Sequence, residues 1–250
     1  MDSKPRKRTQ FNILLLGETG IGKSAFLNAF LNYTSFDSLQ AALSSETVPS
    51  IIPTRFSTFD DNFEEIVIEY GFDKTNSSHV TKQIKSYQFH TEAADLRFID
   101  TPGLGNAEGK DFDKNTLRSV LRTISNLSQI HCVCIFMKPN ETKLNSIFAY
   151  TFRRYLTCLP PELYNNIAFI FTHTRSSFYQ PGDTLVVLRS ILNDVSETEG
   201  SRVPLEEDNV FCLDNEAFRY LVAKKQGIDN IGCEDEYNIS WEKSSEACHR

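Results

Sequence analysis

The sequence has no apolar run near the roughly 18 residues that a membrane-spanning helix needs. Its first ten residues, MDSKPRKRTQ, have no apolar core of the kind found in secretory signals. It also lacks a basic excess: 26 Lys and Arg against 33 Asp and Glu give a formal charge of -7, which argues against a nucleic-acid partner. Of the six cysteines, Cys132 and Cys134 could form one metal-binding pair, but the sequence offers no second pair or histidine cluster that would complete a zinc site. We therefore expect a soluble, cytoplasmic protein.

Apolar, β-branched or aromatic runs alternate along the chain with segments of helical periodicity. The runs that predict strands are 11–16, 65–70, 96–99, 131–137, 167–171 and 210–213. Apolar stripes that predict helices fall at 117–127, 144–159, 185–195 and 218–222, with a short extra helix within 36–43. This alternation predicts an α/β fold with a mostly parallel central sheet and helices on both faces.

The same pass along the chain predicts its domain organisation. Residues 1–10 are interpreted as a disordered basic leader, for which a tether to acidic lipid is the alternative. Residues 11–228 are predicted to form one domain, and residues 229–250 a polar C-terminal extension that leads toward further domains. Ligands of such sheets bind at the carboxyl ends of the strands, where the motifs of interest lie.

A glycine-rich loop with the spacing G-x-x-x-x-G-K-S stands directly after the first predicted strand and opens a helix. Its glycines let consecutive backbone N–H groups turn inward, and the helix N-terminus adds partial positive charge. We expect Lys23 to reach the β- and γ-phosphates of a nucleotide and Ser24 to bind Mg²⁺. The residues predicted to line this site are Gly17, Glu18, Thr19, Gly20, Ile21, Gly22, Lys23, Ser24 and Ala25.

A second motif, Asp100-Thr101-Pro102-Gly103, ends another predicted strand. Asp100 is predicted to hold Mg²⁺ through water, and the Gly103 N–H to sense a γ-phosphate. A further magnesium-sensing threonine is expected between the two motifs, with Thr47, Thr54 and Thr58 as candidates. We favour Thr54, because it lies on a proline-marked loop shortly before the strand at 65–70. Together the motifs indicate a P-loop GTPase (G domain) fold.

Four segments, LLLGETGIGKS, FIDTPGLGN, FIFTHTR and VFCLDNEAF, resemble the avirulence-induced/immunity-associated (AIG/GIMAP-like) GTPases, which are related to septins and chloroplast import receptors. The resemblance extends from about residue 11 to about residue 223. It implies binding of GTP and GDP with Mg²⁺, and slow hydrolysis. It also implies self-association through the nucleotide face as a homodimer or homo-oligomer, and for many members a peripheral membrane association.

The resemblance also implies a base site. His173 falls where the family places a residue on the purine face, and Asp214 and Asn215 fall on the last loop, with Asn215 approaching the guanine edge. The chain departs from the family at Arg175, which stands where the base-reading aspartate is expected. Because arginine has no acceptor, this departure leaves the choice of guanine over adenine open.

The predicted hydrolysis is slow because Leu104 stands where many fast GTPases place a water-orienting glutamine. Asn106 and Glu108 lie on the same stretch, but nothing distinguishes them. Three functions remain: a slow GTPase that acts as a switch or assembly module, a non-hydrolysing nucleotide-binding scaffold, and an NTPase of relaxed base specificity.

Overall fold

The computed structural model describes residues 8–59, 62–71, 83–91, 94–104, 110–127, 129–144, 146–200, 202–229 and 231–250. Most of the predicted leader, Asn106 and Glu108 lie outside the described residues. So do residues 74–82 of the polar segment 74–86, which the sequence predicts to be a loop, although residues 85–86 belong to a strand. Among the described residues, no helix combines the length and the apolar character that crossing a membrane requires.

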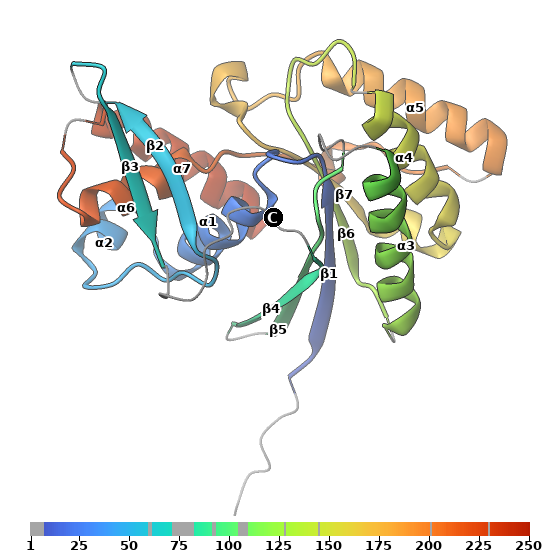
Figure 1. Ribbon diagram of the computed structural model, residues 1–250, viewed down its shortest axis with the longest axis horizontal. Helices are drawn as coiled ribbons and strands as arrows, with labels where there is room; N and C mark the ends of the chain where they lie inside the picture. Colours follow the sequence, from blue (N-terminus) through green and yellow to red (C-terminus); the bar gives the residue numbers. More distant parts are fainter. Residues whose placement is uncertain are drawn as a thin grey trace, which may run out of the picture.

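A six-stranded sheet forms the centre of the molecule, with strand order β4-β5-β1-β6-β7-β8 (Figure 1). Its strands are β1 (Gln10–Gly17), β4 (Lys85–His90), β5 (Asp95–Asp100), β6 (Cys132–Met137), β7 (Ile167–Phe171) and β8 (Val210–Cys212). Only β4 pairs in antiparallel fashion, with β5, and the other four pairings are parallel. The predicted mostly parallel α/β sheet is confirmed.

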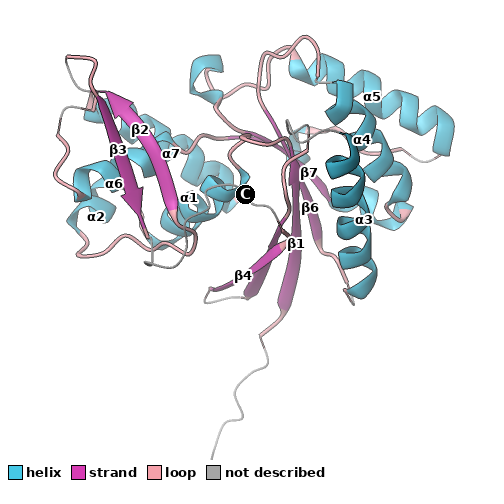
Figure 2. Ribbon diagram, viewed as in Figure 1, coloured by secondary structure: helices cyan, strands magenta, loops and turns pink. Residues whose placement is uncertain are grey.

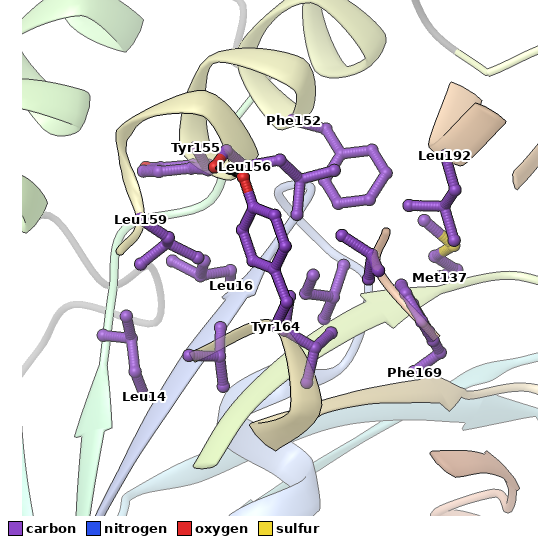
Figure 3. Close-up of a cluster of buried hydrophobic side chains, with 14 of the residues drawn as sticks. Leu14, Leu16, Met137, Phe152, Tyr155, Leu156, Leu159, Tyr164, Phe169 and Leu192 are labelled. Atoms are coloured by element: carbon purple, nitrogen blue, oxygen red, sulfur yellow. Dashed lines mark hydrogen bonds between the residues drawn. The ribbon is translucent and has the colours of Figure 1, made fainter. Parts of the chain in front are cut away.

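Helices cover both faces of this sheet, as predicted (Figure 2). One face carries α3 (Lys110–Asn126), α4 (Ser146–Cys158) and α5 (Thr184–Glu199), and the other carries α1 (Lys23–Ser35), α6 (Glu216–Lys225) and α7 (Glu234–His249). The alternation of side chains along a strand explains the two layers. Leu14 and Leu16 of β1 join the core cluster beside Phe152 of α4 (Figure 3), whereas Leu15 joins Phe26 of α1 on the opposite face.

Two further strands, β2 (Thr54–Phe59) and β3 (Glu65–Tyr70), form an antiparallel sheet of their own, separate from the central one. The face of β3 with the fully buried Ile68 packs into the cluster that also contains residues of α6 and of α2 (Leu39–Ser44). The strand predicted at 65–70 therefore exists outside the central sheet. The sequence pattern does not predict β2 and β4, because antiparallel strands with one open face mix polar and apolar residues.

The segment after residue 228, which we expected to be a polar extension, contains α7 packed within the same domain. This helix contacts α1 and α6. Trp241, only 1% exposed, packs its ring edge-on against Tyr33 of α1, with ring centroids 4.9 Å apart. The prediction failed because one large aromatic residue anchors a helix whose composition is otherwise polar.

Candidate nucleotide-binding site

The glycine-rich loop joins the end of β1 to the start of α1, as the motif predicts. Gly20 and Gly22 have φ angles of 75° and 96°, in the left-handed region that favours glycine. A Cβ on Gly22 would also lie 3.2 Å from Nδ2 of Asn215. The loop can therefore turn its backbone N–H groups inward only because glycine occupies these positions.

Lys23, the first residue of α1, folds its side chain back over this loop. Its ammonium donates hydrogen bonds to the carbonyl oxygens of Gly17 at 3.1 Å and Glu18 at 2.9 Å. Burial lowers the pKa of Lys23 to about 8, against the raising effect of the Asp100 and Glu18 carboxylates. The loop thus has a buried cation whose described hydrogen bonds go to backbone carbonyl oxygens, which a phosphate group could replace.

Ser24 and Asp100 meet at the end of the loop, as the sequence predicts. The Ser24 hydroxyl donates to Oδ2 of Asp100 at 2.9 Å, and Asp100 is fully buried. A hydroxyl and a carboxylate are hard oxygen donors of the kind Mg²⁺ prefers. Among the described residues no group of three or more His, Cys, Asp or Glu could hold a metal. The oxygen atoms of the Ser24–Asp100 pair are chemically suited to a magnesium ion.

The segment after Asp100 lies directly against the glycine-rich loop. The Leu104 N–H donates to the Gly17 carbonyl at 3.1 Å, and the Thr19 N–H donates to the Leu104 carbonyl at 3.0 Å. A Cβ on Gly103 would lie 2.3 Å from Cα of Thr19, so only glycine fits there. The Leu104 side chain is buried in the core, so it cannot orient water.

Thr54 begins β2 rather than lying on a loop. Its hydroxyl donates to the Ile52 carbonyl at 3.3 Å and accepts a hydrogen bond from Asn28 at 2.8 Å. Asn28 lies four residues after Ser24 on α1, about one helical turn further along. The described hydrogen bonds of Thr54 therefore go to Asn28 and Ile52. None of them goes to Ser24 or Asp100.

His173 and Asn215 converge on Gly22, although 42 residues separate them in the sequence. The His173 Nε2 atom and the Asn215 Nδ2 atom are both near the point where a Cβ on Gly22 would stand. The Asn215 amide donates a long hydrogen bond of 3.4 Å to the Gly22 carbonyl, and its buried Oδ1 has no partner among the described residues. Burial, assisted by Lys138, lowers the pKa of His173, so its ring is neutral near pH 7.

Asp214 is predicted to approach the base, but in the structure its carboxylate joins the loop to Ser240 of α7 and to Tyr179. Oδ1 accepts hydrogen bonds from the Ser240 hydroxyl at 2.5 Å and the Glu216 N–H at 2.9 Å. Oδ2 accepts one from the Tyr179 hydroxyl at 2.8 Å. Burial raises the pKa of the Asp214 carboxyl above its ordinary value, and these three hydrogen bonds offset only part of that rise. Asp214 therefore holds the loop in shape.

Arg175 is directed toward α7. It forms an ion pair with Glu236, and its guanidinium carbon lies 5.0 Å from the centroid of the Tyr237 ring. The sequence did not indicate that Glu236 and Tyr237 would contact Arg175, and it did not indicate a role for Ser240 and Ser244. Their only signal is the spacing of Ser240, Trp241 and Ser244 along one helix face.

The comparisons with known proteins agree with the fold. No family model matches the chain. A curated relative, GTP-binding protein A of Dictyostelium discoideum, is 28% identical over 169 residues, or 68% of this chain. The chain spans 29% of the length of that relative.

Among solved structures, the chain is similar to one of the chloroplast translocon components atToc33 and psToc159, for whose GTPase activity dimerisation is said to be important. It aligns with 83% of this chain and 71% of its own, with 14% identity and a TM-score of 0.50. Toc33 from Arabidopsis thaliana in complex with Mg²⁺ and GMPPNP aligns over the same share of this chain, with 16% identity and a TM-score of 0.49. The chain has the fold of the P-loop GTPases.

Proposed function

We propose that this protein binds a guanine nucleotide with Mg²⁺ and hydrolyses GTP slowly to GDP and phosphate, as a nucleotide-controlled switch or assembly module. The observation that carries the proposal is the buried Lys23 ammonium in the glycine-rich loop, next to the Ser24–Asp100 pair. The name of the Dictyostelium relative supports guanine nucleotide as the ligand.

Phosphoryl transfer requires that the nucleotide is bound in position and that the negative charge of its phosphates is neutralised. Lys23 would exchange its two carbonyl partners for β- and γ-phosphate oxygens, and the Gly103 N–H would contact the γ-phosphate. Ser24 and Asp100 would hold Mg²⁺, which supplies further positive charge when bound. Thr54 remains our proposed switch threonine, and it would have to leave Asn28 to reach the metal. With Leu104 buried, a slow reaction is expected until another group orients water.

We further propose a modest preference for guanine. The neutral His173 ring suits stacking on a purine, and the unpartnered Oδ1 of Asn215 is an acceptor for the guanine N–H groups. Asp214 contributes by holding this loop. The alternative is an NTPase of relaxed specificity. It is favoured because Arg175 stands where the base-reading aspartate is expected, and its side chain pairs with Glu236 of α7.

Calorimetric titration of the wild type and Asn215→Ala with GDP, ADP and XDP tests the base site. We expect the wild type to prefer GDP, and Asn215→Ala to lose about tenfold of that preference. Asn238→Ala, a half-buried residue of α7 whose side chain accepts a hydrogen bond from Gln40 of α2, is the matched control. Equal wild-type affinity for GDP and ADP would support the relaxed NTPase, and an unchanged preference in Asn215→Ala would refute the loop assignment.

The proposal includes assembly as a homodimer through the nucleotide face. The structural neighbour with atToc33 and psToc159 supports it, because dimerisation is described there as important for GTPase activity. The narrower AIG/GIMAP-like membership, with a cytoplasmic location and peripheral membrane association, rests on the four sequence segments alone. Release of phosphate in a single turnover distinguishes the GTPase from a non-hydrolysing scaffold.

A further inference from the structure

One face of α7 is buried although the helix is mostly polar. Ser240 and Ser244 are fully buried, and Trp241 between them is 1% exposed. Positions four residues apart lie on the same side of a helix, so both hydroxyls face the same neighbour. Buried hydroxyls are costly unless they form hydrogen bonds, and here the neighbour that receives them is the loop after β8.

The two serines form four hydrogen bonds, three with Asp214 and one with Ala217. The Ser240 hydroxyl donates to Oδ1 of Asp214 at 2.5 Å and accepts from the Ala217 N–H at 3.2 Å. The Ser244 hydroxyl accepts from the Asp214 N–H and donates to the Asp214 carbonyl, both at 3.1 Å. The backbone on both sides of Asn215 is thus held by α7.

The same helix also holds the other segment that borders the base site. Glu236 and Tyr237 receive Arg175, two residues after His173. By contrast, the hydrogen bonds of Lys23 and the Ser24–Asp100 contact connect β1, α1 and β5. The helix therefore contacts the two base-site segments more directly than it contacts the phosphate-binding groups.

We propose that α7 is a positioning helix for the base half of the nucleotide site, with Ser240 and Ser244 as positioning residues. This inference rests on the proposed nucleotide binding. The energetic coupling is reciprocal: a docked α7 orders the loop that binds the base, and a bound base stabilises the docking of α7.

The double variant Ser240→Ala/Ser244→Ala tests this role, with Ser245→Ala as the matched control. Ser245 lies on the same helix, but its hydroxyl donates to the Tyr33 carbonyl rather than to the loop. Binding is measured for GDP with Mg²⁺ and for inorganic tripolyphosphate, which has no base. We expect the double variant to weaken GDP binding about tenfold or more and to leave tripolyphosphate binding unchanged. Unchanged GDP binding, or a parallel loss of both ligands, would refute the proposal.

Amide hydrogen exchange of the wild type tests the coupling without any variant. Saturating GDP should slow exchange in residues 234–249 more than saturating tripolyphosphate does, with α5 as the internal reference. Equal exchange in α7 under both ligands would contradict the coupling. A wild type that does not bind GDP would instead overturn the proposed function, so the two failures are distinguishable.

Discussion

The hydroxyl of Ser24 donates a hydrogen bond of 2.9 Å to Oδ2 of Asp100, across 76 residues of sequence. The contact joins the first turn of α1 to the end of β5. Because both groups are oxygen donors beside the glycine-rich loop, the fold itself brings the proposed magnesium-binding pair together.

Replacing Ser24 by Ala should remove most of the magnesium dependence of GDP binding. The wild type is expected to bind GDP more tightly with Mg²⁺ than with a chelator, and the variant to bind almost equally in both. Ser38→Ala is the control: it removes the N-terminal cap of α2, costs about 1 kcal/mol of stability, and should keep the magnesium response. A full magnesium response in Ser24→Ala would contradict the assignment.

The affinity for GDP should fall as the pH rises above about 8. Lys23 has a pKa of about 8 in the free protein, and phosphate oxygens raise it in the complex. Above pH 8 binding must therefore take up a proton, and affinity drops by up to about tenfold per pH unit. Titration calorimetry between pH 7 and 9, in buffers of different ionisation enthalpy, measures both the affinity and the proton uptake.

Lys23→Arg provides the control for this pH dependence, because arginine remains charged throughout the range. Its affinity should be lower than that of the wild type but flat with pH. A wild-type affinity that is equally flat, with no proton uptake, would show that Lys23 is not the phosphate-binding cation.

Arg175→Ala should leave the preference between GDP and ADP unchanged, because the guanidinium is directed toward Glu236 and Tyr237. Its ion pair is partly exposed, so we expect a loss of at most about 1 kcal/mol of stability. Denaturant unfolding and paired titrations with GDP and ADP measure both effects. A changed ratio of the two affinities would place Arg175 at the base after all.

Trp241→Ala should destabilise the whole domain by about 3–5 kcal/mol, since it leaves a large cavity against Tyr33. In a chain of this size, the melting temperature should fall by roughly 2–4 °C per kcal/mol. Ile239→Ala, two residues away and 54% exposed, should have almost no effect. Similar melting temperatures for the two variants would indicate that α7 does not belong to the domain core.

Specific GTPase activity should increase with protein concentration if a second protomer completes the site that Leu104 leaves incomplete. Turnover is measured across a wide dilution series together with the molecular mass in solution. Activity that stays constant while the mass remains monomeric would argue against assembly through the nucleotide face.

The sequence predicted the elements whose information is local. The glycine-rich loop could be recognised because eight consecutive residues determine its backbone, its cation and its metal ligand. Asp100 could be found because it ends an apolar strand. Strands such as β4 could not, because an antiparallel strand with an exposed face resembles a polar loop in sequence.

The sequence by itself determined the class of fold, the residues of the proposed phosphate site, and the presence of an arginine rather than a carboxylate at position 175. Only the tertiary structure decided what surrounds the base. In the structure the Asp214 carboxylate accepts a hydrogen bond from Ser240, Arg175 pairs with Glu236 of α7, and Ser240 and Ser244 are buried. These contacts join residues 26 to 61 positions apart on different elements. The physical reason is that a hydrogen bond between distant elements depends on how helices pack, and the local pattern of neither partner records it.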